Sequence, residues 1–154
     1  MAAVTTLRRV EVADRLRELL DTDADTVVIA GPPRNPQEGR LIVIGDITGE
    51  LSVPHMTSGR KQYDDRFEVE ILCIGWDPGA EDFSTVDAAA QEMGEHVHDI
   101  LADHPQLEAT TTSDGLDGVV SSVAARFDGP NRWWNPEGAG AAMKIAVEVH
   151  VRIS

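Results

Sequence analysis

The residues best suited to chemistry in this sequence lie together in one stretch, EMGEHVHDILADH, which runs from Glu92 to His104. It contains three histidines and four carboxylates, which are side chains that bind divalent metal ions. A tight protein site for such an ion needs three or four of these side chains to converge on one point. Whether the stretch is a metal site therefore depends on the secondary structure that positions them.

The stretch is predicted to be helical, and a helix separates its histidines. One apolar stripe at helical spacing predicts the buried face: Val86, Ala89, Ala90, Met93, Val97, Ile100 and Leu101. At about 100° per residue, His96 and His98 point about 200° apart and cannot bind one ion within the helix. His96 could pair with Glu92, and His104 suits the helix C-terminus, where the helix dipole favours an imidazolium. We therefore predict a solvated polar face, with no metal ligands.

Other signatures of catalysis are weak. The sequence has no GxSxG nucleophile motif, and its single cysteine, Cys73, lies in an alternating apolar run that is typical of a buried small hydrophobic residue. GAGAAM at Gly138–Met143 has two glycines of a dinucleotide-binding fingerprint but lacks the third, and it leads into a predicted strand instead of a helix. We predict no catalytic or cofactor-binding residues, and the chain is not expected to be an enzyme.

Composition bounds the class of protein. The chain has 154 residues, which favours one domain over residues 1–154. With 13 basic and 27 acidic residues its net charge is -14, which disfavours binding to nucleic acid. The charge favours solubility, or else keeps a polyanion from binding a surface that it passes. No segment approaches the roughly 20 apolar residues of a membrane helix, and the N-terminal residues lack a signal-peptide pattern, so the chain is expected to stay where it is made.

The apolar patterns predict two helices and five strands. One helix, capped by Thr5 or Thr6, is expected to run to about Leu20. Another is expected to be capped by Ser84, with Asp87 three positions later in a capping box, and to end near His104. Strands are expected at Thr26–Ala30, Leu41–Ile44, Arg66–Ile74, Val119–Phe127 and Ala142–Ile153. Only one helix lies between the later strands, which favours an α+β fold with a mainly antiparallel sheet covered by the helices.

Two of the strands alternate between apolar and charged side chains. In Arg66–Ile74, Phe67, Val69, Ile71 and Cys73 share one face, and Glu68 and Glu70 lie on the other. In Ala142–Ile153, the apolar face holds Ile145, Val147, Val149, Val151 and Ile153, and the other holds Lys144, Glu148, His150 and Arg152. Each of these strands is therefore expected to have one buried and one polar face.

Two long polar segments, Gly45–Asp65 and Asp128–Ala141, are expected to be loops. Loops of this length tend to be functional, or to become ordered by a neighbour. The second contains Arg132, Trp133 and Trp134 between turn-forming residues, and arginine and tryptophan are enriched at protein interfaces. These three residues are our candidates for a protein interface. The alternative is that one or both tryptophans fold back to cover the edge of the sheet.

The order of these features resembles a known family. The features are the N-terminal helix, VVIAGPP, a loop into RFEVEILCIGWDPG, the helix STVDAAAQEMGEHVHDIL, the passage DHPQLEATTTSDGLDGVV and the final strand AMKIAVEVHVRIS. Together they cover nearly the whole chain and resemble the tail terminator proteins of long-tailed bacteriophages, also described as minor tail or tail completion proteins. The resemblance lies in element order and loop placement, and it carries over no functional residues.

The resemblance implies a structural virion protein at the head-proximal end of the tail, assembled in the cytoplasm of a bacterial host. Such a subunit forms a hexameric ring on the last ring of the major tail tube protein, stops tube polymerisation and joins the tail to the head connector. It has no active site and no cofactor. DNA would pass through the lumen without specific binding, and negative charge there would repel phosphate. The alternatives are a head-to-tail connector adaptor and, less favoured, a small metal-dependent enzyme using His96.

Overall fold

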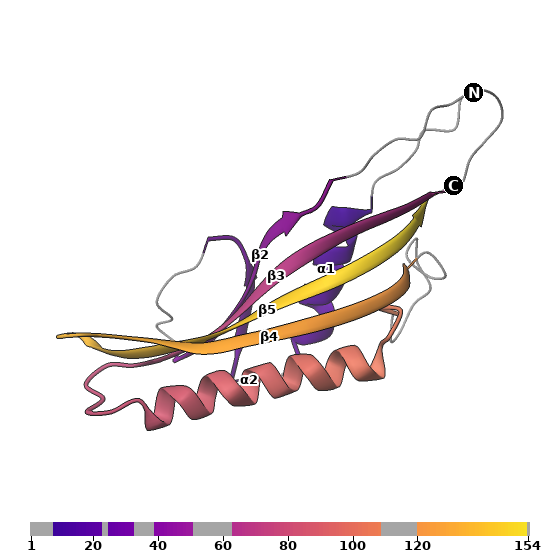
Figure 1. Cartoon of the computed structure of the whole chain (residues 1–154). Coiled ribbons are helices and arrows are strands. Elements are labelled where there is room, and N and C mark those ends of the chain that lie inside the picture. Colours follow the sequence, from indigo (N-terminus) through magenta and orange to yellow (C-terminus); the bar gives the residue numbers. More distant parts are fainter. Residues whose placement is uncertain (1–7, 23–24, 33–38, 51–62, 109–119, 154) are drawn as a thin grey trace, which may run out of the picture.

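The computed structural model describes residues 8–22, 25–32, 39–50, 63–108 and 120–153. The elements are α1 (Arg9–Leu20), β1 (Val27–Ala30), β2 (Arg40–Thr48), β3 (Tyr63–Asp77), α2 (Ser84–Asp103), β4 (Val120–Asn135) and β5 (Gly138–Ile153). They form one sheet with the strand order β1-β2-β3-β5-β4, along which α2 lies (Figure 1). The predicted α+β class is confirmed. The sheet is mixed, because β1 runs parallel to β2 while β2–β3, β3–β5 and β4–β5 are antiparallel.

The main core lies on the face of the sheet that both helices cover. It joins α1, through Val12 and Leu16, and α2, through Met93 and Val97, to the inward side chains of the strands. The predicted alternation is confirmed in β3 and β5, whose apolar positions are buried there: Phe67, Val69, Ile71, Cys73, Ile145, Val147, Val149 and Val151. The opposite face, which we call the open face, carries the charged side chains of the same strands.

A smaller apolar cluster lies on the open face near one end of the sheet. Leu41 and Val43 of β2 and Ile74 of β3 are buried there, with Trp133 of β4 packed against them. Neighbouring strands place these residues side by side, since Leu41 pairs with Ile74 in the register of β2 and β3. The open face is therefore apolar at this end and charged farther along the strands.

The prediction of a loop at Asp128–Ala141 is wrong, because these residues form a β-hairpin. β4 continues to Asn135 and β5 already begins at Gly138. The glycines and the proline that predicted a loop fit the strands: a register shift between Asp128 and Asn131 accommodates the cis Gly129–Pro130 bond on the edge strand. Gly138 has a φ of 156° and lies so close to the Asp77 carbonyl that a Cβ atom would clash with it.

The other expected loop, Gly45–Asp65, is also shorter than predicted. β2 extends to Thr48 and β3 begins at Tyr63, while residues 51–62 lie outside the described ones. Asp65 is fully buried and receives hydrogen bonds of 2.8 and 2.7 Å from Nε and Nη2 of Arg9 in α1. Nη1 of Arg9 donates to the carbonyl of Gly49. This ion pair fixes the start of α1 against the ends of β2 and β3.

The beginnings of the helices differ from the prediction. The expected caps Thr5 and Thr6 lie outside the described residues. Ser84 is the first residue of α2, preceded by Phe83 at the cap position, so it is not the N-cap. The carboxylate of Asp82 instead accepts bonds from the Ser84 amide at 3.0 Å and hydroxyl at 2.6 Å, because the amide groups that open a helix attract negative charge. None of the described helices is long and apolar enough to cross a membrane.

Candidate functional site

Strand alternation splits the three predicted interface residues between the two faces of the sheet. Arg132, Trp133 and Trp134 are successive residues of β4, where neighbouring side chains point in opposite directions. Arg132 pairs with Ala141 and Trp134 with Ala139, whose side chains lie on the face covered by α2, whereas Trp133 pairs with Gly140 and lies on the open face. The three residues therefore do not form one surface.

Arg132 binds within the molecule. Its Nε and Nη2 atoms donate to the two carboxylate oxygens of Asp87 in α2, at 3.0 and 2.6 Å. Its guanidinium also stacks 5.6 Å from the ring centroid of Phe83. The hydrogen bonds that Arg132 donates to Asp87 raise the pKa of Arg132 above its ordinary value. These contacts attach the β4–β5 hairpin to the first turn of α2.

Trp133 covers the sheet. Its ring packs on the cluster of Leu41, Val43 and Ile74 and lies directly over Gly140 of β5, where a Cβ atom would overlap the indole. Glycine is required at this position by the close approach of the ring. The alternative prediction, that a tryptophan folds back on the sheet, is therefore confirmed for Trp133.

Trp134 is left as the candidate contact residue. Its side chain is 64% exposed. It lies one residue before the end of β4, next to the hairpin tip. The hairpin projects beyond the N-terminal end of α2 (Figure 1). A large aromatic side chain held in water on a fixed strand favours a partner surface, since tryptophan is the residue type most enriched among the residues that dominate interface energetics.

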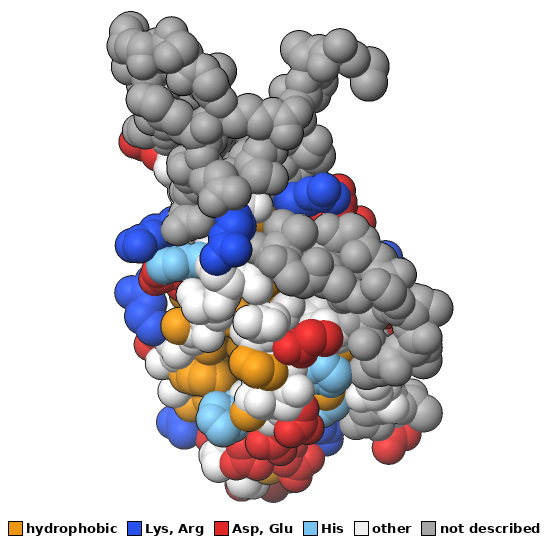
Figure 2. Space-filling model, turned by 90° about the vertical axis from the view of Figure 1, so that its right-hand side faces the viewer, with side chains coloured by type: hydrophobic (Ala, Val, Ile, Leu, Met, Phe, Trp, Pro, Cys, Tyr) orange, Lys and Arg blue, Asp and Glu red, His pale blue; other side chains and the backbone are white. Residues whose placement is uncertain are grey.

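An apolar groove lies between α2 and the edge strand β4. We call it the α2–β4 groove, and it has a volume of about 260 Å³ and is lined by Gln91, Gly94, Glu95, His98, Phe127 and Met143. Phe127 is 42% exposed, and its ring centroid lies 6.2 Å from that of His98. Figure 2 shows hydrophobic side chains gathered above the acidic lower end of the molecule, where α2 lies. The sequence pattern predicted that Phe127 ends a strand, but it did not indicate that the side chain would be exposed.

The two histidines of α2, and His104 directly after it, point to different neighbours. Nε2 of His96 lies 3.2 Å from the carbonyl oxygen of Leu20 at the end of α1, whereas His98 faces β4. Nδ1 of His104 lies 3.8 Å from the carboxylate of Glu108. The predicted separation of His96 and His98 is confirmed. Within the described ranges, no three histidine, cysteine, aspartate or glutamate side chains are grouped so that they could hold a metal ion.

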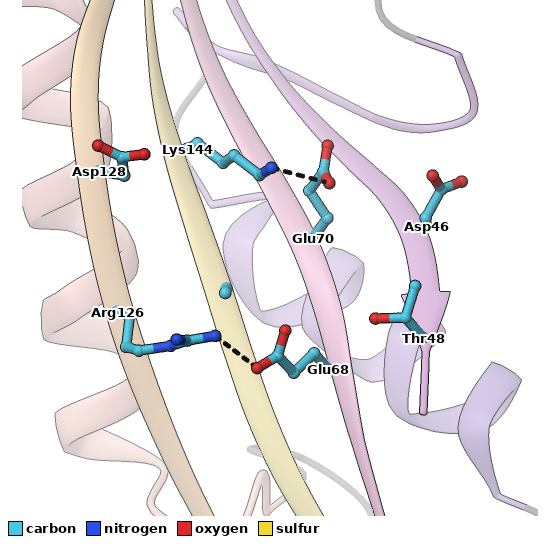
Figure 3. A pocket seen from close by; sticks show the side chains of 8 residues that line it. Asp46, Thr48, Glu68, Glu70, Arg126, Asp128 and Lys144 are labelled. Carbon is cyan, nitrogen blue, oxygen red and sulfur yellow. Dashed lines mark hydrogen bonds and ion pairs between the residues drawn. The ribbon is translucent and has the colours of Figure 1, made fainter. Parts of the chain in front are cut away.

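The open face of the sheet holds a polar hollow that sequence reasoning missed. It has a volume of about 440 Å³ and is lined by Asp46, Thr48, Glu68, Glu70, Arg126, Asp128, Lys144 and Ala146 from four strands (Figure 3). Arg126 pairs with Glu68 at 2.6 Å, and Lys144 with Glu70 at 3.7 Å. Four carboxylates thus face two cations, so the hollow is acidic. The alternation of β3 and β5 predicted Glu68, Glu70 and Lys144 on polar faces, but Asp46 and Asp128 fell in expected loops.

Cys73 lies in the core, as predicted. It is fully buried on β3, and burial raises the pKa of its thiol to about 12. A thiol with such a pKa is not a nucleophile at neutral pH, because the thiolate is the reactive form.

Comparisons with known proteins give no family for the chain. No protein-family model matches it, and no curated protein matches its sequence.

Proposed function

We propose that the protein is a structural subunit of a long-tailed bacteriophage, a tail terminator. In this proposal six copies form a ring on the last ring of the major tail tube protein, stop its polymerisation and join the tail to the head connector. The protein would be part of the virion at the head-proximal end of the tail, after assembly in the bacterial cytoplasm. The function needs surfaces that bind other subunits and requires no chemical reaction.

The observation that carries the proposal is the exposed Trp134 on a projecting hairpin. Among the described residues, Trp134 and Phe127 are exposed large hydrophobic side chains of the same edge strand, β4. Tryptophan is enriched among the residues that dominate the energetics of protein interfaces, which supports a role for this strand in assembly. A subunit that works by assembly needs such a surface.

The position of β4 supports the same proposal. It is last in the order of the described sheet and is 16 residues long. A long edge strand presents backbone donors and acceptors to other chains, and natural proteins protect such edges or use them. The register shift at Asp128–Asn131 and Pro130 protect part of this edge, which leaves side-chain contacts as the means of association.

The charge of the molecule fits a ring that DNA crosses. The net charge is -14, and the hollow on the open face carries four carboxylates beside two cations. Acidic walls repel phosphate and would let DNA pass without binding. In the proposed ring, the open face of the sheet lines the channel.

The test combines the protein with the major tail tube protein encoded in the same phage genome. Electron microscopy of the purified chain should show six-fold rings, and adding the chain during tube polymerisation should shorten the tubes and leave a ring at one end. Tubes of unchanged length and no bound ring would refute the proposal. Binding to the connector without any effect on tube length would identify a head-to-tail adaptor instead.

A further inference from the structure

We propose that Arg132 and Asp87 are positioning residues for Trp134. Their ion pair holds the end of the β4–β5 hairpin in the orientation in which the Trp134 side chain contacts another protein of the tail. This role rests on the proposed function, in which Trp134 is the exposed contact residue. It gives Arg132 a part in assembly that does not require Arg132 to touch the partner.

The end of β4 is attached to the molecule on both faces of the sheet. On the open face, the Trp133 ring packs over Gly140 of β5. On the face covered by α2, Nε and Nη2 of Arg132 donate to the two carboxylate oxygens of Asp87 at 3.0 and 2.6 Å. The outer side of β4 has no neighbouring strand in the described sheet. The Arg132–Asp87 ion pair therefore supplies the attachment of this strand end to the helix.

A register shift separates the end of β4 from the rest of the strand. The pairing with β5 is regular from Ser122 to Asp128, and it resumes at Asn131 with one extra residue in β4. An extra residue of this kind interrupts the ladder of backbone hydrogen bonds and bends the strand. The direction of the strand end therefore depends on contacts outside the ladder, and the ion pair is such a contact.

The geometry of the ion pair is suited to fixing an orientation. Two parallel hydrogen bonds between a planar guanidinium and a carboxylate restrict angles as well as distance. The guanidinium also stacks 5.6 Å from the ring centroid of Phe83, which occupies the N-cap position of α2. Asp87 lies in the first turn of this helix, and the helix is anchored in the main core through Met93 and Val97. Arg132 is thus held by a well-packed element.

Trp134 takes its position from Arg132, because it follows two residues later on the same face of β4. Such residues lie about 7 Å apart along a strand. A guanidinium that Asp87 did not hold could stack on the nearby indole, since aromatic rings attract cations. Asp87 therefore keeps the Trp134 ring accessible as well as fixing the strand. A contact side chain that is oriented before association loses less conformational entropy on binding, which favours affinity.

The experiment measures the concentration of the chain that halves the length of tubes formed by the major tail tube protein. Arg132→Gln and Asp87→Asn should each raise this concentration by about 10-fold. Arg132→Lys should have a smaller effect, because lysine keeps the charge but loses the second parallel bond. The melting temperature should fall by less than about 4 °C, since an exposed ion pair adds little stability. The matched control is Arg40→Gln, which removes a 2.8 Å ion pair between β2 and Glu92 of α2.

A double-mutant cycle shows whether Arg132 acts through Trp134. Trp134→Ala alone should raise the capping concentration by about 30-fold, as expected for a residue that dominates an interface. Adding Arg132→Gln should raise it little further, because a truncated side chain needs no positioning. Effects that add in full, or capping that is unchanged by Arg132→Gln alone, would overturn the positioning role.

Hydrogen exchange separates this inference from the proposed function. Backbone amides of residues 131–138 should exchange faster in Arg132→Gln than in the unmodified chain, whereas Arg40→Gln should leave them unchanged, because exchange reports local opening. Unchanged exchange in Arg132→Gln would overturn the positioning role, whether or not the unmodified chain caps tubes. If the unmodified chain fails to cap tubes, the proposed function is refuted, and faster exchange in Arg132→Gln would still support the role of the ion pair in orienting the hairpin.

Discussion

At the residue scale, the adjacent tryptophans of β4 differ in what surrounds them, and this predicts different effects of mutation. Trp133 is packed on Leu41, Val43 and Ile74, whereas Trp134 is 64% exposed. Trp133→Ala should lower the free energy of unfolding by about 3 kcal/mol. This value is at the low end of the range for buried aromatic residues, because Trp133 is only half-buried. Trp134→Ala should change it by less than about 0.5 kcal/mol. Urea denaturation of dilute protein measures both, and equal losses would contradict the assignment of Trp133 to the sheet.

Cys73 provides a second prediction at this scale. Burial raises the pKa of its thiol to about 12, so at about pH 8 only about one molecule in ten thousand carries the reactive thiolate. Iodoacetamide should therefore leave the folded chain unmodified and label it once in denaturing urea, as measured by intact mass. Rapid labelling of the folded chain would show that β3 opens locally or that Cys73 is accessible.

At the element scale, the start of α2 depends on a charge. The side-chain and backbone hydrogen bonds from Ser84 lower the pKa of Asp82 below its ordinary value. A lowered pKa in the folded state means that Asp82 stabilises the protein above the ordinary aspartate pKa of about 3.9, and that this contribution is lost as the pH falls through the lowered value. Asp82→Ala should thus lower the melting temperature at neutral pH and have little effect in strong acid. A pH-independent difference would mean that the carboxylate charge plays no part.

The sequence predicted those elements whose conformation is encoded by residues close together in the chain. β3 and β5 were predicted because their apolar and charged residues alternate, and a strand with one buried face needs that alternation. The end of the β4–β5 hairpin was missed because Gly129, Pro130 and Gly138 are typical of loops. Their strand conformation depends on contacts across the sheet, such as the Trp133 ring over Gly140, which no local pattern encodes.

The candidate site was predicted only in part for the same reason. The choice of Arg132, Trp133 and Trp134 was based on residue type, but their roles depend on strand alternation, which a predicted loop does not have. The α2–β4 groove needs Gly94 and Phe127 to meet across two elements. The hollow on the open face gathers residues of four strands, and strand order cannot be read from the spacing of residues in the chain.

At the scale of the whole molecule, the helices cover one face of the sheet and leave the acidic hollow on the other. If the open face lines a channel for DNA, reversing its charge should create an attraction to phosphate. The double variant Asp46→Lys with Asp128→Lys should bind duplex DNA in a salt-dependent manner and slow DNA ejection from phage that carry it, because a concave charged surface concentrates its field. Mobility-shift assays and ejection kinetics measure the two effects.

The matched control places the same charge reversal on the covered side of the molecule. Asp99 and Asp103 are exposed near the C-terminal end of α2, so Asp99→Lys with Asp103→Lys changes the net charge equally without altering the hollow. This variant should bind DNA less tightly than the open-face variant and leave ejection unchanged. Equal binding by both variants would assign the effect to net charge. Normal ejection with the open-face variant would remove the channel role of the hollow, since reversed charges lining a channel cannot be neutral toward the phosphates that pass them.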